Sequence, residues 1–340
     1  MADRRRTPPV GYMPAPDAPH NGGIVNMWPF DKKSKEQKPL ELQLPFVAPI
    51  LPDSEKIALV LMGGGERGRF QLGPLKWLEQ IGLLQQCKIF VGTSVGGLNA
   101  LALLKNWGKT NCVDYVFEMW DKIRQNSDIY DGKLDVWGFV KMVTIKCKSI
   151  LNQQGLYRVL KNHFDGMMLK DFGVDVGITA TNLNTRKAEV FTNRTHPDMS
   201  VVLVGKMTSA IPGVFQYQEY NGDKYCDGGV LNNLPIETAI QMGATKVIMI
   251  GTGPRNLDRQ EVKSDGVSVL LATLNVLLDS PEAEMWRDID ERYPSVEILK
   301  LYADQDTGDA VQFGRLDLRD IGYRTAVKHI TLDKVKEWAK

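Results

Sequence analysis

The chain has 340 residues, 43% of them hydrophobic, which is enough for one large α/β domain or for two smaller domains with buried cores. Lys and Arg (42) nearly balance Asp and Glu (41), and a net charge of +1 excludes a whole-protein field that attracts nucleic acid or an acidic membrane. The four cysteines have no CxxC spacing, which argues against a zinc site or a disulfide scaffold and favours reduced, intracellular thiols.

Residues 1 to about 50 predict a flexible amino-terminal extension. They are rich in Pro, Gly and charged residues, as in PPVGYMPAPDAPHNGG and DKKSKEQK, and this composition buries too little apolar surface to offset the entropy of ordering. No apolar segment follows the MADRRR start, and no run of about 18 apolar residues occurs anywhere. We therefore expect a soluble, cytoplasmic protein without signal peptide or transmembrane segment, whose membrane contact is local and peripheral.

Strands and helices alternate through the remaining residues, 51–340. Continuous apolar runs typical of buried parallel strands are KIALVLMGGG from Lys56 and KIFVGT from Lys88, and helices are expected after them over 70–81 and 96–104. Further strand-like runs are VDVGITATNL, AEVFTN, TKVIMIGT and VEILKLY, and further helices are expected in MSVVLVGKMTSAI and over 267–278. This alternation predicts a mostly parallel central sheet covered by helices on both faces.

Strand signals lapse between residues 110 and 165, where we expect a helical cap beside the sheet. Within it, DVWGFVKMVTIKCKSIL mixes aromatic and aliphatic residues with Lys141, Lys146 and Lys148. A helix of this composition either packs its apolar face on the domain, which is the simpler interpretation, or touches a lipid surface with it.

The glycine-rich stretch GGGERG, residues 63–68, follows the first strand and has two interpretations. As G-x-G-x-x-G it matches a dinucleotide-binding turn, but that turn needs an acidic residue about 20 positions further on, at the end of the second strand. Gly92, Thr93 and Ser94 stand there instead. Alternatively, backbone amides without side chains around them converge on a developing oxyanion.

The second strand ends in G-x-S-x-G, with Ser94 between Gly92 and Gly96. The two glycines permit a sharp strand-to-helix turn that exposes the serine hydroxyl. The amino terminus of the following helix favours negative charge at that hydroxyl. We therefore interpret Ser94 as a nucleophile.

A nucleophilic serine needs a base, and the histidines are poor candidates. His20 lies in the extension, and the other three, His163, His196 and His329, are more simply surface or packing residues. A partly desolvated carboxylate can take the proton directly, because burial raises its pKa toward the working range. Asp227 in KYCDGGVLNNLP is the best candidate, since two glycines after it let the backbone approach another loop closely. A plain hairpin turn is the alternative interpretation of this stretch.

With these three motifs, the chain resembles the patatin-like phospholipases over roughly residues 56–252, with a further similar helix ending near Lys328. The resemblance implies a three-layer α/β/α patatin-like domain over 51–340. It also implies that Ser94 is the nucleophile and Asp227 the base of a Ser-Asp dyad, which cleaves lipid acyl esters through an acyl-enzyme without calcium, another metal or a cofactor. The supporting residues it implies are the oxyanion hole of Gly63, Gly64, Gly65, Arg67 and Gly68, the nucleophile elbow glycines Gly92 and Gly96, and the aspartate-motif glycines Gly228 and Gly229.

Two positions depart from the family pattern. Met62 precedes the triple glycine where a polar or small residue is more usual, and Pro74 stands inside the first helix. We expect Met62 to alter the outer contacts of the loop and Pro74 to kink the helix, but neither change removes a catalytic group.

Two other functions stay open. An α/β-hydrolase esterase would use Ser94, Asp227 and His329 as a triad in that order, although its oxyanion loop usually carries a histidine where Met62 stands. A catalytically silent module would bind a lipid or a nucleotide without reacting. The expected partners are a phospholipid or other acyl-ester lipid and a membrane surface, with no nucleic acid, and the sequence identifies no regulatory partner or oligomer.

Overall fold

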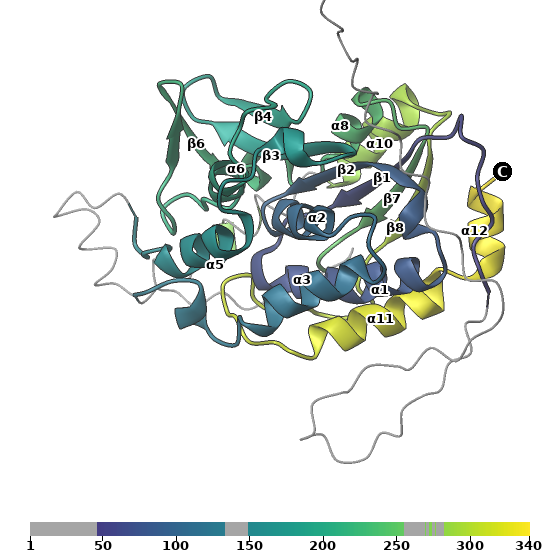
Figure 1. Ribbon diagram of the computed structural model, residues 1–340, viewed down its shortest axis with the longest axis horizontal. Coiled ribbons are helices and arrows are strands. Elements are labelled where there is room, and N and C mark those ends of the chain that lie inside the picture. Colours follow the sequence, from purple (N-terminus) through teal and green to yellow (C-terminus); the bar gives the residue numbers. More distant parts are fainter. Residues whose placement is uncertain (1–45, 133–148, 255–268, 270–271, 274–275, 277–281) are drawn as a thin grey trace, which may run out of the picture.

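A computed structural model describes residues 46–132, 149–254, 269, 272–273, 276 and 282–340 (Figure 1). The strands of its sheet are β1 (Ile57–Leu61), β2 (Cys87–Thr93), β3 (Asp175–Asn182), β4 (Lys187–Thr192), β5 (Gln218–Tyr220), β6 (Asp223–Asp227), β7 (Lys246–Ile250) and β8 (Glu297–Leu301). The α-helices in the described ranges are α1 (Leu72–Gln80), α2 (Val95–Lys105), α3 (Cys112–Asp121), α5 (Gln154–Phe164), α6 (Val201–Thr208), α7 (Gly229–Asn232), α8 (Ile236–Gln241), α10 (Glu282–Arg292), α11 (Leu318–His329) and α12 (Leu332–Trp338).

The strands form one eight-stranded sheet in the order β5-β6-β3-β2-β1-β7-β8, with β4 paired to β3 outside this path. The pairs among β3, β2, β1, β7 and β8 are all parallel. The pairs that β3 makes with β4 and β6, and the pair of β5 with β6, are antiparallel. The mostly parallel sheet expected from the sequence is therefore confirmed, with an antiparallel edge that the sequence did not indicate.

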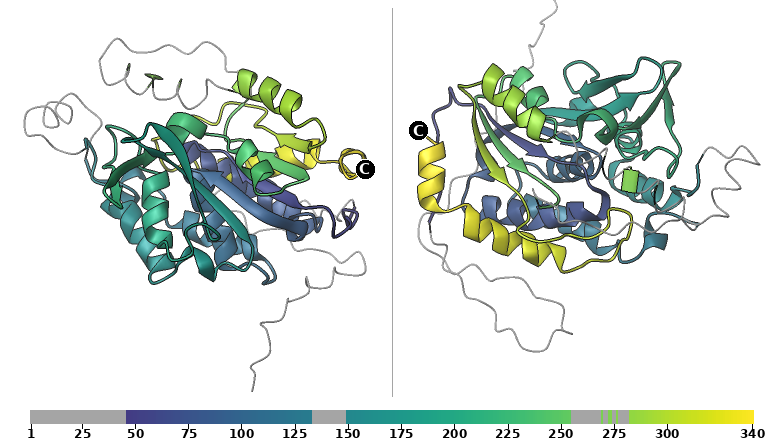
Figure 2. Two further views of the ribbon diagram at one scale, coloured as in Figure 1. Left: turned by 90° about the horizontal axis from the view of Figure 1, so that it is seen from above. Right: turned by 180° about the vertical axis from the view of Figure 1, so that it is seen from behind.

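Both faces of the sheet are covered, because alternate residues of a strand point to opposite faces. In β1, Ile57, Leu59 and Leu61 belong to one apolar cluster, while Ala58 and Val60 belong to another. The larger cluster includes side chains of α1, α2, α3, α6 and α11, and the smaller one includes side chains of α8 and α10. This arrangement confirms the three-layer α/β/α domain (Figures 1 and 2).

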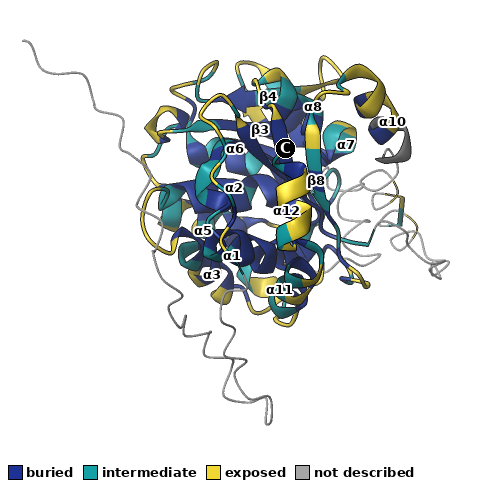
Figure 3. Ribbon diagram, turned by 90° about the vertical axis from the view of Figure 1, so that its right-hand side faces the viewer, coloured by how far each residue is buried: buried dark blue, intermediate teal, exposed yellow. Residues whose placement is uncertain are grey.

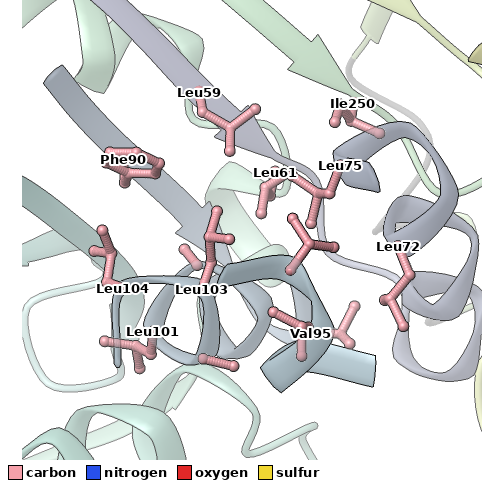
Figure 4. Close-up of a cluster of buried hydrophobic side chains, with 14 of the residues drawn as sticks. Leu59, Leu61, Leu72, Leu75, Phe90, Val95, Leu101, Leu103, Leu104 and Ile250 are labelled. Atoms are coloured by element: carbon pink, nitrogen blue, oxygen red, sulfur yellow. The ribbon is translucent and has the colours of Figure 1, made fainter. Parts of the chain in front are cut away.

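Large aliphatic side chains fill the first of these interfaces. Figure 4 shows Leu59, Leu61 and Phe90 of the strands facing Leu75 of α1 and Leu103 of α2, all of them fully buried. Side chains of this size each contribute roughly 1.5–3 kcal/mol when they leave water. In Figure 3 the central strands and inner helices are mostly buried, whereas β4, β8 and the outer side of α12 are partly exposed.

The helix expected over 70–81 is divided into a 3-10 helix, η1 (Gly65–Gln71), and α1. Pro74 is the third residue of α1, within its first turn, where helical amides lack an intrahelical partner in any case. Pro74 therefore does not need to kink α1 as expected, because it lies at the start of the helix and not in its interior.

Residues shortly before position 51 contact the domain. The ring of Phe46 meets Trp77 edge-on with 5.9 Å between ring centroids, and the amide of Ala48 donates to the carbonyl of Ile81.

Residues 1–45, the lysine-rich segment 133–148 and most of 267–278 lie outside the described residues. Within the region expected to be a cap, α3 packs on α1 and α2, and α5 packs on α6. None of the helices in the described ranges has the length and apolar character to cross a membrane.

Candidate active site

The glycine-rich loop and the nucleophile elbow leave the sheet side by side. They follow β1 and β2, which are parallel neighbours with Leu61 in register with Gly92. Asp227 reaches the same edge from the other direction, because β6 runs antiparallel to β3 and pairs Asp227 with Ala180. The sheet thus brings together three motifs that are far apart in the sequence.

Ser94 has an unusual backbone conformation, with φ 52° and ψ −128°. A non-glycine residue rarely adopts a positive φ, and such strain is typical of functional sites whose surroundings enforce it. The turn also requires both flanking glycines. A Cβ on Gly92 would lie 2.6 Å from the carbonyl of Gly96, and a Cβ on Gly96 would lie 2.2 Å from the carbonyl oxygen of Leu61. The expected strained corner is present, but the expected exposure of the serine is not, because Ser94 is only 5% exposed.

The hydroxyl of Ser94 donates a hydrogen bond of 2.6 Å to Oδ2 of Asp227. The other carboxylate oxygen, Oδ1, accepts from the amide of Gly229 at 2.8 Å, and the amide of Asp227 donates to the carbonyl of Ala210 at 2.9 Å. These bonds fix the carboxylate in one orientation. Burial raises the pKa of Asp227 to about 7, although the hydrogen bonds from Ser94 and Gly229 act in the opposite direction. At neutral pH this group can accept a proton.

The stretch after Asp227 is not a hairpin turn, because β6 leads directly into α7. A Cβ on Gly228 would lie 2.4 Å from the carbonyl oxygen of Thr179, so only glycine fits beside β3. Gly229 supplies the amide that binds the carboxylate. The close backbone approach expected from the two glycines is therefore present.

Some backbone amides of the glycine-rich loop donate to other parts of the described chain, and others do not. The amide of Gly63 donates to the carbonyl of Asn233 at 3.1 Å, and that of Glu66 donates to the carbonyl of Ala310 at 2.8 Å. Among the described residues, the amides of Gly64 and Gly65 have no acceptor. Gly63 thus holds the loop, whereas Gly64 and Gly65 have amides that can meet a substrate.

Arg67 and Gly68 support the loop in other ways. Both the amide and Nε of Arg67 donate to the carbonyl of Gly64, at 3.1 and 3.4 Å. A Cβ on Gly68 would lie 2.5 Å from the methyl groups of Val95, so glycine lets η1 pack closely on α2. Val95 begins α2 directly after Ser94, a position at which a helix amide commonly completes an oxyanion hole in serine hydrolases.

A narrow pocket of about 60 Å³ lies beside Ser94 and Gly65. Apart from Ser94 and Ser209, its lining side chains are all apolar. They include Leu98 of α2, Trp120 of α3, Leu160 of α5, Phe215 after α6, and Val311 and Phe313 before α11. This lining suits a hydrocarbon chain.

The histidines of the described ranges bind other partners. Nε2 of His329 lies 2.6 Å from Oδ1 of Asp304 at an exposed position. The hydroxyl of Tyr115 lies 2.7 Å from Nδ1 of His163, and His196 pairs with a neighbouring threonine. The geometry therefore does not support the alternative triad with His329.

Met62 is 3% exposed and packs in the smaller apolar cluster, with α8 and α10. Its carbonyl accepts from Nε2 of Gln71 at 2.8 Å. The departure at Met62 therefore changes packing behind the glycine-rich loop and not the face toward Ser94.

The family model of the patatin-like phospholipases matches residues 59–240. The chain belongs to the patatin-like phospholipase family. This match contains the glycine-rich loop, Ser94 and Asp227.

Related proteins match over part of their length. Lysophospholipase NTE1 of Phaeosphaeria nodorum is 24% identical over 222 residues, which are 65% of this chain and 14% of that protein. Probable lipid hydrolase 463L of Invertebrate iridescent virus 6 is 29% identical over 54% of this chain and 63% of its own length. Patatin-like phospholipase domain-containing protein 6 of Mus musculus is 26% identical over 79% of this chain and 20% of its own length. The chain thus spans less than two thirds of each of these relatives.

Two solved structures are similar at low identity. VipD from Legionella pneumophila matches 85% of this chain and 67% of its own, with 14% identity and a TM-score of 0.45. Human GIVD cytosolic phospholipase A2, in complex with methyl gamma-linolenyl fluorophosphonate, matches 87% of this chain and 61% of its own, with 10% identity and a TM-score of 0.44.

Sequence reasoning missed several residues that shape the candidate site. The hydroxyl of Thr208 accepts from the amide of Ser94 at 2.7 Å and donates to the carbonyl of Thr179 at 2.6 Å. These bonds tie Ser94 to α6 and β3. The carbonyl of Asn233 anchors Gly63, and Ala310 lies against Gly65. No local pattern marks these residues, because each acts through a contact between distant segments.

Proposed function

We propose that this chain hydrolyses carboxylic ester bonds of phospholipids by means of a Ser94–Asp227 dyad. The observation that carries the proposal is the 2.6 Å hydrogen bond from Ser94 to a buried carboxylate whose pKa is raised to about 7. A carboxylate in this state is a sufficiently strong base to take the serine proton as the hydroxyl attacks.

In the acylation step, the acyl chain of the substrate occupies the apolar pocket and its carbonyl carbon lies at Ser94. Asp227 takes the proton of Ser94 while the bond from Oγ to the carbonyl carbon forms. The carbonyl oxygen becomes an oxyanion, stabilised by the amides of Gly64 and Gly65 and, at the start of α2, of Val95. The ester C–O bond then breaks, and the leaving alcohol receives the proton from Asp227.

Deacylation repeats these movements with water. Asp227 takes a proton from a water molecule whose oxygen attacks the acyl carbon, and the second oxyanion lies against the same amides. The bond to Ser94 breaks, and Oγ receives the proton from Asp227, which regenerates the enzyme and releases a fatty acid. Each proton moves between Asp227, Ser94, the substrate and water, so we propose a calcium-independent reaction that EDTA leaves unchanged.

We also propose that the protein contacts membranes peripherally during turnover. The pocket takes a hydrocarbon chain, and phospholipids with long chains reside in membranes. Substrate must therefore enter the pocket from a lipid surface.

Release of fatty acid from phosphatidylcholine vesicles, together with hydrolysis of a soluble fluorogenic ester, tests this function. We expect the wild-type protein to hydrolyse both substrates and Ser94→Ala to hydrolyse neither. Ser149→Ala is the matched control, because Ser149 is a partly buried serine bonded to the carbonyl of Leu151 and absent from the pocket lining. Hydrolysis by Ser94→Ala at the wild-type rate would contradict the proposed function.

A further inference from the structure

Residues 309–315, which we term the wall segment, lie outside the part of the chain that matches the family model. They precede α11 and return to the glycine-rich loop about 250 positions earlier in the chain. The carbonyl of Ala310 accepts from the amide of Glu66, and a Cβ on Gly65 would lie 2.0 Å from that carbonyl oxygen. The wall segment is therefore the surface on which the oxyanion loop rests.

A buried carboxylate joins the two segments. Glu66 is fully buried, and its Oε1 accepts from the amides of Gly314 and Arg315 at 3.0 and 2.9 Å. The same oxygen accepts from Nε of Arg69 at 3.0 Å. Glu66 thus neutralises a buried arginine and holds the end of the wall segment with a single oxygen.

Arg69 extends this connection to the end of α3. Its Nη2 donates to the carbonyl of Ile123 at 2.6 Å and its Nη1 to that of Trp120 at 3.3 Å, and its guanidinium lies 4.8 Å from the centre of the Trp120 ring. Trp120 and Ile123 both line the pocket. The Glu66–Arg69 pair therefore connects the oxyanion loop to two walls of the pocket.

The wall segment is also held from its other side. The amide of Phe313 donates to Oδ1 of Asn126 at 2.7 Å, and the hydroxyl of Tyr130 donates to the carbonyl of Val311 at 2.8 Å. Ala310, Val311 and Phe313 line the pocket beside Ser94. Their position thus depends on contacts with both Glu66 and Asn126.

A buried ion pair is weak evidence for stability, because the cost of removing both charges from water can exceed their attraction. The second carboxylate oxygen of Glu66, Oε2, is buried and has no hydrogen-bond partner among the described residues, which adds to this cost. A role in geometry accounts for the pair better than stability does, since catalysis requires the oxyanion donors to be placed closely.

We propose that Glu66 is a positioning residue, and that through it the wall segment forms part of the active site of this chain. Glu66 holds the loop that presents the amides of Gly64 and Gly65, and it fixes the wall against which the acyl chain packs. The inference rests on the proposed hydrolase function.

Glu66→Gln tests the positioning role. Glutamine keeps an acceptor for the amides of Gly314 and Arg315 but leaves Arg69 without its negative partner. We expect kcat on a soluble short-chain ester to fall between about 10- and 100-fold, as a misplacement of about 1 Å costs, with KM nearly unchanged. The acid limb of the pH–rate profile should remain, because Asp227 keeps its contacts.

Glu79→Gln is the matched control. Glu79 is also a buried carboxylate that binds a cation, Lys76, at 2.8 Å and a backbone amide, that of Val113, at 3.0 Å, but it does not line the pocket. We expect both variants to lower the melting temperature, and only Glu66→Gln to lower kcat of the folded protein, measured after circular dichroism confirms folding. A kcat of Glu66→Gln within twofold of wild type, or an equal fall in Glu79→Gln, would overturn the proposal.

Asn126→Ala decides the question independently, since Asn126 is exposed and its removal is compatible with folding. It releases the amide of Phe313 and loosens the wall segment without touching Glu66. We expect kcat/KM to fall more for a long-chain ester than for a short-chain ester, by at least about threefold in their ratio. An unchanged ratio would show that the wall segment is not part of the active site. In all these assays, activity of wild type and its loss in Ser94→Ala show separately that the hydrolase function itself holds.

Discussion

Asp227 and Asp304 lie in two regions of the molecule whose surroundings shift the pKa of an aspartate in opposite directions. Asp227, at the end of β6, is buried, and loss of water raises its pKa to about 7. Its carboxylate accepts a hydrogen bond from the hydroxyl of Ser94. Asp304 follows β8, is exposed and lies beside the end of α11. Burial tends to raise its pKa, but hydrogen bonds from Lys328 and His329 together outweigh this and lower it. Burial without a cation makes a carboxylate a base, whereas a cationic partner makes it a stable anion.

This difference also separates a dyad from a triad. In a triad the aspartate orients a histidine and the histidine takes the serine proton. Here Asp227 binds the hydroxyl of Ser94 directly, and the histidine of α11 binds another aspartate. The comparison of the two aspartates therefore predicts how each of them responds to mutation.

The largest effect is expected from Asp227→Asn. The substitution keeps the shape of the side chain but removes the base, and we expect kcat to fall by about 10⁴-fold or more, as in serine enzymes whose catalytic residues are disabled. The measurement is turnover of a soluble ester. Asp304→Asn is the matched control, and its kcat should stay within about twofold of wild type. Equal losses in the two variants would mean that the environments of the aspartates do not determine their roles.

Gly65→Val is expected to have the next largest effect. Gly65 has φ 57°, and any Cβ there meets the carbonyl oxygen of Ala310 at 2.0 Å, so the loop must shift and carry its amides away from the oxyanion. Loss of one such donor lowers kcat by about 10²–10³-fold. Gly166→Val is a useful control, because Gly166 has φ 75° with open space around it. If Gly65→Val is folded and turns over a short ester at the wild-type rate, the loop does not form the oxyanion hole.

His329→Ala is expected to have the smallest effect. His329 binds Asp304 at the end of α11 and not the dyad, so the variant should retain at least about a tenth of wild-type kcat/KM. The corresponding barrier change is no more than about 1.4 kcal/mol. A folded His329→Ala protein as inactive as Ser94→Ala would instead support the triad of Ser94, Asp227 and His329.

Local chemistry made much of the site predictable from the sequence. The strained turn at Ser94 needs glycines at 92 and 96, and these stand in the sequence beside the serine they serve. The strands before them are continuous apolar runs because both of their faces are covered. Asp227 was also predictable, since the two glycines after it permit the close approach that the fold requires.

The remaining features depend on contacts that no local pattern records. Strand β6 pairs with β3 about 45 positions earlier, and this pairing, rather than any turn signal, brings Asp227 to Ser94. The hydrogen bond from the amide of Gly63 to the carbonyl of Asn233 was equally unpredictable. Nothing in GGGERG distinguishes an amide that is bound within the structure from one that can meet a substrate. Residues 309–315 carry no motif, and their place at the site depends on the packing of the carboxyl-terminal part of the chain on η1.

The pH dependence of Ser94 phosphonylation tests the dyad most directly. An alkyl fluorophosphonate added to the protein across a range of pH, with the modified serine quantified by mass spectrometry, reports the reactivity of the nucleophile alone. The base must be deprotonated to act, so the rate should fall about tenfold per pH unit below an apparent pKa of about 7 and level off above it. The dyad predicts the same profile in His329→Ala and very slow labelling without this limb in Asp227→Asn. Loss of the limb in His329→Ala, or its persistence in Asp227→Asn, would contradict Asp227 as the base.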